Sequence, residues 1–446
     1  MGFQQGLSGL NVSSKNLEVI GNNVANASTF GAKTARAEFS DMYANALNGA
    51  GSNNIGIGAT LSTVAQQFTQ GNITTTENPL DLAVNGNGFF MLSTPNNQQV
   101  YSRNGQFKLN NEGFIVNNGG HKLLGNRAEN GEIISGPPVP LVLPTDGIQP
   151  QRTEEVTLEM TFDSRADIAS GTGVDFDDPR TFNFATSQTV YDDKGQALGL
   201  TYYFRKTGND SWDMYATANG TSVQVDGAGD PARVANITFP ATGGTATNPT
   251  DPALLNPGDP GTITTYDAGG AALAISGNGI FSMPTITGAT LANGTPILDI
   301  NIGAFDMSKS TEFGTSFGVT NLAQNGYARG ELSSMTVEND GTVLARYSNG
   351  QSKAAGQVVL ATFRNPQGLQ SLGGNEWANT IGSGDPIPGA PGSGNVGLLQ
   401  SGALEESNVD LTGELVNMIV AQRMYQANAQ TIKAEDQVLQ TLVNLR

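Results

Sequence analysis

The two ends of the chain carry a helical repeat of apolar residues that the middle lacks. Near the N-terminus, apolar residues recur at intervals of 4, 3, 7 and 7 positions, and Ser14 and Gly21 occupy the same series. This spacing places them on one face of a helix, like the a and d positions of a coiled coil. The apolar members of this predicted N-terminal seam are Phe3, Leu7, Leu10, Leu17 and Val24. The pattern fails at residues 28–31, where Gly31 favours a helix end.

The C-terminal repeat is longer. Its positions alternate by 4 and 3, no Gly or Pro interrupts residues 414–446, and either Asp410 or Asn408 is a suitable N-cap. The apolar members of this predicted C-terminal seam are Leu411, Leu415, Met418, Tyr425, Ile432, Leu439 and Val443. A helix of about 35 residues would extend roughly 50 Å, which is too long for an ordinary packed helix.

The spacing alone leaves open what the seams contact. Each seam fits the core side of an amphipathic helix, but two seams at opposite ends of one chain favour pairing with each other and then with neighbouring copies. Val416, Ile419, Val420 and Met424 add apolar surface away from the C-terminal seam. One partner helix cannot cover all of this surface, so we predict an oligomer whose assembly seam comprises both predicted seams.

Between the ends, short apolar stretches alternate with turn residues. Residues 100–103 and 106–109 flank Asn104 and Gly105, and residues 335–338 and 342–347 flank a turn at 339–341, so we predict a β-hairpin at each place. Both hairpins flank a long central segment, which suggests one β-domain that the chain enters twice.

The predicted fold is therefore mainly β with α-helical termini. It has long N- and C-terminal helices pairing as a coiled coil, a discontinuous β-domain and an inserted outer β-domain. We predict a helical domain at 1–34 and 408–446, a connector at 35–75 and 380–407, the discontinuous β-domain at 76–149 and 323–379, and the insertion at 150–322.

Charge and composition exclude several classes of function. The 446 residues carry a formal charge of −18. Residues 151–322 hold 8 basic and 20 acidic residues, so 20 − 8 = 12 of these negative charges lie on the insertion, as suits a solvated exterior. An acidic chain does not suit nucleic acid. No apolar run reaches the length of a membrane span, and the N-terminus shows no cleavable secretory signal.

The sequence offers no constellation for catalysis. It has no Cys and a single His, His121, so thiolate chemistry, His clusters and a Ser-His-Asp triad have no basis. The acidic stretch around Asp175 lacks the Gly and distal Glu of a calcium loop and is better interpreted as a surface turn. We expect no catalytic, cofactor-binding or metal-binding residues, and thus no enzyme.

Three stretches resemble the flagellar rod–hook family of axial proteins. They are residues 6–10 with 17–26, residues 88–90 with 101–107, and residues 401–411 with 421–429. They lie in the family's order and cover about a fifth of the chain. One departure is that Gly31-Ala32-Lys33 stands where the family usually has Gly-Phe-Lys. The large acidic insertion favours the hook members of this family over the distal rod members.

The resemblance implies a structural subunit of a flexible curved tube, the hook, which joins rod to filament and transmits motor torque as a universal joint. The terminal helices would form the inner tube. The implied partners are copies of itself, the distal rod protein, the hook cap, the hook–filament junction proteins and the flagellar export apparatus. The implied location is the extracellular flagellum, reached without a cleaved signal peptide. The alternatives are a distal rod or other axial protein and, more remotely, a secreted carbohydrate-binding β-protein.

Overall fold

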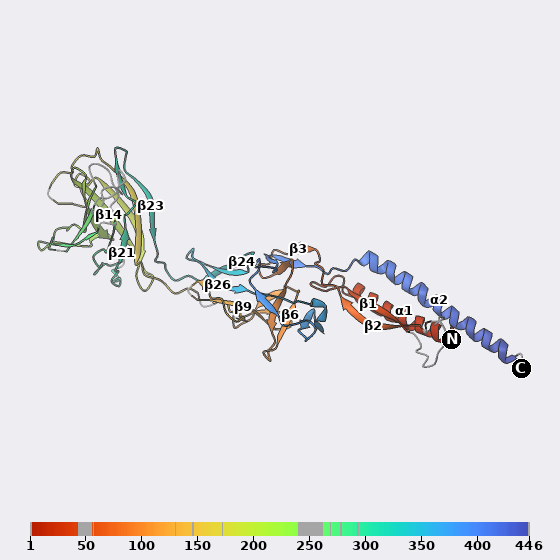
Figure 1. The fold of residues 1–446 in the computed structure, drawn as a ribbon. Helices are drawn as coiled ribbons and strands as arrows, with labels where there is room; N and C mark the ends of the chain where they lie inside the picture. The colour runs from red at the N-terminus through yellow and green to blue at the C-terminus, as the bar shows by residue number, and fades with distance from the viewer. Residues whose placement is uncertain are drawn as a thin grey trace. The chain divides into compact units, whose positions relative to one another are not determined.

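The computed structural model describes residues 2–42, 56, 58–129, 131–144, 147–171, 173–239, 262–267, 269–276, 279–291 and 294–444, without the side chains of residues 2, 274–276 and 442–444. The chain forms two units (Figure 1). The first comprises residues 1–145, 332–346 and 352–446, and the second comprises residues 146–331 and 347–351. The second unit is therefore inserted into the chain of the first.

The first unit contains both α-helices of the described residues and many short strands. Its elements before the insertion are α1 (Gly2–Ala25), β1 (Ala35–Met42), β2 (Gly58–Gln66), β3 (Ile73–Thr75), β4 (Leu82–Asn85), β5 (Phe89–Ser93), β6 (Gln99–Ser102), β7 (Phe107–Leu109), β8 (Ile115–Asn117), β9 (Lys122–Glu129), β10 (Glu132–Ile133) and β11 (Val139–Pro140). Those after it are β24 (Leu332–Val337), β25 (Thr342–Tyr347), β26 (Ser352–Val358), β27 (Leu360–Thr362), the 3-10 helix η2 (Pro366–Gly368), β28 (Gln370–Gly373), β29 (Glu376–Ala378), β30 (Ile387–Gly389), β31 (Leu398–Ser401), β32 (Ala403–Glu405) and α2 (Leu411–Asn444).

Strands from both sides of the insertion make one large sheet. Its main path runs β24-β25-β26-β9-β5-β6-β29-β28, and β27 joins β5. Every residue of β5 is buried because successive side chains point to opposite faces and both faces are covered. Phe90 and Leu92 belong to the core on one face, whereas Phe89 and Met91 belong to the core on the other.

One predicted hairpin is confirmed and the other is wrong. Strands β24 and β25 are neighbours across the turn at 339–341, as predicted. Strands β6 and β7 do not pair across Asn104 and Gly105, since β6 pairs with β5 and β29 whereas β7 pairs with β8. The backbone of Gly105 instead lies against Leu82, whose N–H donates to the Gly105 carbonyl at 3.0 Å. A Cβ at position 105 would lie 1.7 Å from the Leu82 oxygen, so Gly serves this contact and not a tight hairpin.

The second unit consists of two sheets around one core. Its strands are β12 (Glu155–Asp163), β13 (Phe184–Tyr191), β14 (Ala197–Gly208), β15 (Ser211–Ala218), β16 (Thr221–Ser222), β17 (Ala235–Thr238), β18 (Thr262–Tyr266), β19 (Ala272–Ser276), β20 (Ile280–Phe281), β21 (Ala304–Asp306), β22 (Thr311–Phe313) and β23 (Gly318–Gln324). One sheet is ordered β13-β14-β15-β17-β18-β19 and the other β20-β21-β12-β22, with β23 also paired to β12.

Alternating side chains join these two sheets. In β12 every second residue from Val156 to Phe162 is buried. The Phe162 ring lies 5.2 Å from Phe204 and 5.0 Å from Trp212, both on the other sheet. The two inner faces thus share one aromatic core, as in a β-sandwich.

The predicted fold class is confirmed: the chain is mainly β, its helices lie at the two ends, and they pair with each other. The predicted domain boundaries stay predictions.

Candidate functional site

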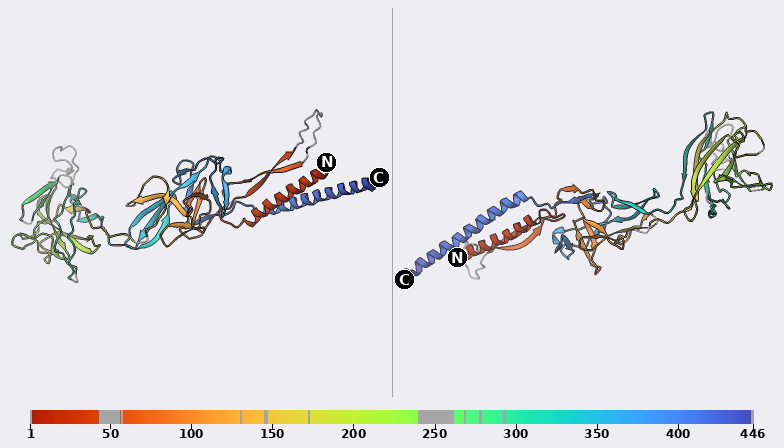
Figure 2. Two further views of the ribbon diagram at one scale, coloured as in Figure 1. Left: turned by 90° about the horizontal axis from the view of Figure 1, so that it is seen from below. Right: turned by 180° about the vertical axis from the view of Figure 1, so that it is seen from behind.

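Helix α1 lies between α2 and the two-stranded ribbon of β1 and β2 (Figures 1 and 2). On the ribbon side, the Ser8 hydroxyl donates to the Ala59 carbonyl at 2.6 Å and accepts from the Ala59 N–H at 2.9 Å. On the other side α1 runs antiparallel to α2, since Gly6 faces Ile432 while Asn23 lines a cavity with Glu414.

The two helices meet through small and polar residues. A Cβ at Gly6 would lie 2.9 Å from the Ile432 side chain, and one at Gly9 would lie 2.7 Å from that of Asn428. Ser13 is buried and its hydroxyl is 3.4 Å from the Asn428 amide nitrogen. Gly and Ser at intervals of 3 and 4 let the helix backbones approach closely. This strip of α1 begins with Gly6, Gly9 and Ser13 and continues along the same side of the helix to Asn23, and we call it the contact face.

The predicted N-terminal seam is a different face of α1. From Leu7 onward, each residue of this seam comes one position after a residue of the contact face. One position corresponds to a rotation of about a quarter to a third of a turn around the helix axis, so the seam faces a different direction. Phe3 and Leu7 are 47% and 46% exposed, and Leu10, Leu17 and Val24 are half-buried. The helices therefore pair as expected, but across the contact face, because small residues permit closer packing than the larger seam residues.

Most of the predicted C-terminal seam is also uncovered in the single chain. Leu411, Leu415, Tyr425 and Leu439 are exposed, whereas Met418 and Ile432 are half-buried, Ile432 through its contact with Gly6. The side chain of Val443 lies outside the described residues. Among the described side chains of α2, the other large apolar residues that are exposed are Val416, Ile419, Val420, Met424 and Val438.

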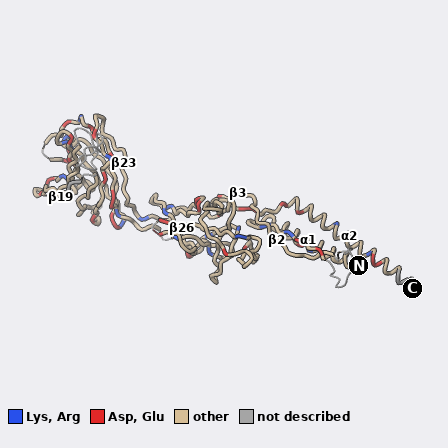
Figure 3. Tube along the Cα trace, viewed as in Figure 1, with Lys and Arg blue, Asp and Glu red and all other residues tan. Residues whose placement is uncertain are grey.

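The helices therefore present a large apolar surface with little charge. Charged residues are sparse along both (Figure 3), and those of α1 are Lys15 and Glu18, which pair with each other at 2.8 Å. Such a surface on a folded chain indicates a protein–protein contact.

Polar side chains form hydrogen bonds at the start of α2 and in the segment that follows α1. Asp410 caps α2, since its carboxylate accepts from the Thr412 N–H at 3.0 Å. Asn408 instead accepts from the N–H and hydroxyl of Thr34 at 2.7 and 2.8 Å and donates to the Gln67 carbonyl at 2.8 Å. The segment that leaves α1 is thus bonded to the segment that enters α2.

A buried ion triad lies beside these bonds. The Glu405 carboxylate, with no exposed side-chain surface, accepts from Lys33 Nζ at 2.6 Å and from Arg103 Nη1 at 3.2 Å. The Gly71 N–H donates to the same carboxylate at 2.9 Å. Arg103 also donates to the Gly86 carbonyl at 3.0 Å, and Lys33 to a further backbone carbonyl at 2.8 Å. The triad connects the end of α1, the large sheet and the strand before α2.

Burial works against the cations of this triad. Desolvation lowers the pKa of Lys33 and of Arg103, and the Glu405 carboxylate opposes that shift in both. Removing Glu405 would therefore leave two desolvated cations without a counter-charge.

Comparison with known proteins places this arrangement in a family. Over its whole length the chain is 39% identical to the flagellar hook protein FlgE of Salmonella typhimurium and 37% identical to that of Escherichia coli, and covers each completely. The chain belongs to the flagellar hook protein FlgE family. Four family models match: the flagella basal body rod protein (3–33), the flagellar hook protein FlgE/F/G D1 domain (83–161), the flagellar basal body protein FlaE D2 domain (148–327) and the flagellar basal body rod FlgEFG protein C-terminal region (400–445). Among solved structures, the chain is similar to the flagellar hook protein FlgE2 of Helicobacter pylori, with 12% identity, 75% of this chain and 99% of that chain covered, and a TM-score of 0.49.

Membership establishes a structural subunit of the flagellar hook that polymerises and is not an enzyme. The sparse chemistry of the sequence agrees with this. Within the described residues, neither helix is both long and apolar enough to cross a bilayer.

The three FlgE-like motifs converge on the triad. Lys33 follows the N-terminal motif, Arg103 lies in the β-domain motif and Glu405 in the C-terminal motif. The sequence pattern does not reveal the triad, because charged residues far apart in sequence give no periodic signal. The available signal was a charged residue in or beside each motif, although the first and third motifs have more than one and only Arg103 lies within the second.

Gly31 brings the first two motifs together. Its φ of 72° is in the left-handed region, and a Cβ there would lie 2.6 Å from the Asn104 backbone nitrogen. Ala32, where the family usually has Phe, is 4% exposed. The segment thus packs closely at both residues.

Proposed function

We propose that the two predicted seams carry the contacts between copies in the hook. The supporting observation is that α1 and α2 pair through the contact face and fully bury none of the described side chains of the predicted seams. Each aliphatic side chain that a neighbouring copy covers contributes about 1.5–3 kcal/mol. The uncovered surface on two sides of α2 requires more than one neighbour, as in a tube.

In this proposal the paired helices form the inner tube and the acidic insertion faces the exterior. The polymer is the flexible curved joint between rod and filament. The specific partners of the subunit in this proposal are the distal rod protein, the hook cap, the hook–filament junction proteins and the export apparatus. This apparatus would export the chain without a cleaved signal peptide. These assignments are supported by the family's role in the flagellum and by the low charge of the helices.

Leu439→Asp tests the seam most directly. Leu439 is 52% exposed in the single chain, so the substitution should leave the subunit folded and yet prevent tube formation seen by electron microscopy. Gln437→Asp is the matched control, because it adds the same charge to an exposed polar position of α2. Circular dichroism of both variants should match the parent. Normal tubes from Leu439→Asp would contradict the proposed role of the seam.

A further inference from the structure

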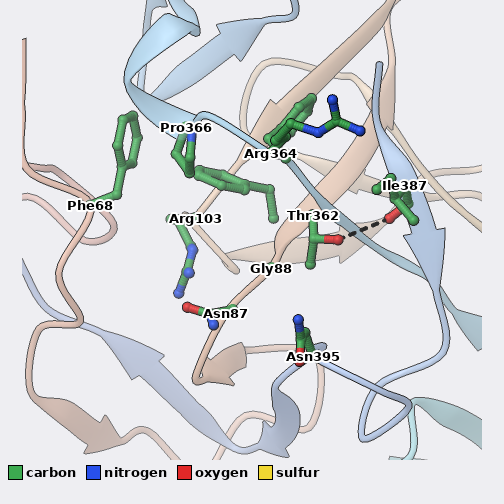
Figure 4. Close-up of a pocket in the computed structure, with 11 residues that line it drawn as sticks. Phe68, Asn87, Gly88, Arg103, Thr362, Arg364, Pro366, Ile387 and Asn395 are labelled. Atoms are coloured by element: carbon green, nitrogen blue, oxygen red, sulfur yellow. Dashed lines mark hydrogen bonds between the residues drawn. The ribbon is translucent and has the colours of Figure 1, made fainter. Parts of the chain in front are cut away.

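A cavity of about 360 Å³ opens beside the ion triad. Its aromatic wall comprises Phe68, Phe89 and Phe363. Arg103 and Arg364 line different sides of it (Figure 4). The lining comes from the segment after β2, the start of β5, the residue after β6, the chain from β27 to η2, β30 and the segment before β31, so six separate parts of the first unit build it.

The charge around this cavity is unbalanced. The triad holds two cations and one carboxylate, and within the described residues no other carboxylate forms an ion pair with Lys33 or Arg103. Arg103 has a 4% exposed side chain, and its Nε has no hydrogen-bond partner. Arg364 is exposed and has no ion pair in the part of the chain that the structure describes. The cavity is therefore positive, and the exposed Arg364 is the guanidinium that an incoming anion can reach.

Its walls suit a planar anion on an apolar stem. The Arg103 guanidinium already lies over the Phe89 ring, 5.1 Å from its centroid. Aromatic walls exclude water and strengthen an ionic contact inside. A guanidinium favours a carboxylate, which it can bind through two parallel hydrogen bonds. The positive charge disfavours a metal ion.

We propose that this cavity receives an Asp or Glu side chain from a second copy of the chain. The inference rests on the proposed function, because only a polymer holds a second copy there at high local concentration. The chain carries 40 acidic and 22 basic residues, so its own surface is the nearest abundant source of carboxylates. The contact would balance the positive charge of the triad and fix one copy relative to the next.

Carbodiimide coupling of an Arg364→Lys variant tests the contact, since the reagent joins an amine to a carboxylate only when the two touch. Tubes grown from equal parts of ¹⁵N-labelled and unlabelled protein are treated and digested. We expect mass spectrometry to find the peptide that carries the substitution joined to an Asp- or Glu-containing peptide of mixed isotope composition, absent from monomer. Arg346→Lys is the control, because Arg346 is also exposed in the first unit and does not line the cavity.

A second variant measures the contribution of the contact. Arg364→Glu should raise the protein concentration needed for tube growth about tenfold, the factor that corresponds to 1.4 kcal/mol. Its thermal unfolding as a monomer should match that of the parent, since Arg364 is exposed.

The outcomes separate the two proposals. If the parent chain forms no tubes, the proposed function fails. If tubes form but the amine introduced by Arg364→Lys couples to nothing, or only within its own copy, the cavity contact is overturned. If benzoate binds the monomeric parent at this cavity by NMR and no coupling between copies occurs, the cavity is a solute site and the proposed occupant is wrong.

Discussion

Substituting Glu405 by Gln tests whether the buried triad holds the first unit together. The change keeps the shape of the side chain and removes the one negative charge that Lys33 and Arg103 share. Leaving buried charge uncompensated costs about 3–5 kcal/mol. Because the total free energy of unfolding of a folded protein is about 5–15 kcal/mol, this cost is a large fraction of the total. We therefore expect the ratio of folded to unfolded first unit to fall roughly a hundred- to several-thousand-fold.

Lys33→Met provides the informative comparison. It removes one cation and leaves Glu405 and Arg103 as a balanced pair, so its cost should be that of one charge-assisted hydrogen bond, about 1.5–3 kcal/mol. The double variant should lose less than the sum of the two, because the second change removes a cation that the first left unpaired. Glu406→Gln is the control: Glu406 is half-buried and forms no ion pair among the described residues, so a change within about 0.5 kcal/mol is expected.

Trp377 supplies the assay. Its indole N–H donates to the Gln66 side chain at 2.6 Å, and its ring packs edge-on against Phe68 and Phe89, with centroids 5.5 and 5.8 Å away. Urea unfolding of the monomer, followed by Trp377 fluorescence in a Trp212→Phe background, therefore reports on this region. If Glu405→Gln proves as stable as Lys33→Met, the carboxylate does not compensate the two cations and the reasoning fails.

Three further predictions follow from other contacts. Gly6→Ala should weaken the pairing of α1 and α2 and slow tube growth, because the new Cβ would lie 2.9 Å from the Ile432 side chain. In the control Gly21→Ala, on the same helix, the new Cβ meets nothing within 4 Å, so this change should be neutral or should stabilise the protein by up to about 1 kcal/mol. Thermal unfolding and electron microscopy of tubes check both variants. Replacing residues 147–331 by a short Gly-Ser linker should leave a folded first unit that still forms tubes of altered curvature, and loss of tubes from a folded deletion variant would make the insertion an assembly element. Burial raises the pKa of Glu312 in the folded chain. The stabilisation that the protonated carboxyl contributes is therefore fully present below the ordinary pKa of a glutamate and is lost as the pH rises through the raised value. The melting temperature of the second unit, measured relative to Glu312→Gln, should fall over that pH interval, and parallel pH profiles of the two proteins would refute this.

The sequence alone determined the elements whose signal is local. The helical repeats predicted α1 and α2, because 3.6-residue periodicity is visible in any window longer than a few turns. The turn residues at 339–341 predicted the hairpin of β24 and β25, because the turn and both strands lie within one short stretch of sequence. The neutral ends, the acidic middle and the lack of reactive residues set the class of function.

Tertiary structure decided which residues meet. Asn104 and Gly105 resemble a hairpin turn, but β6 pairs with the strand before it, β5, and with the distant β29, whereas β7 pairs with the strand after it, β8. The turn residues do not decide between these pairings, because each depends on which strands the folded sheet brings together. The triad joins positions 33, 103 and 405, whose pairing depends on desolvation and distance in the folded chain. The sequence also identified the apolar seams but not the contact face, because spacing shows where a helix is apolar, whereas close approach depends on the small residues that let two backbones touch.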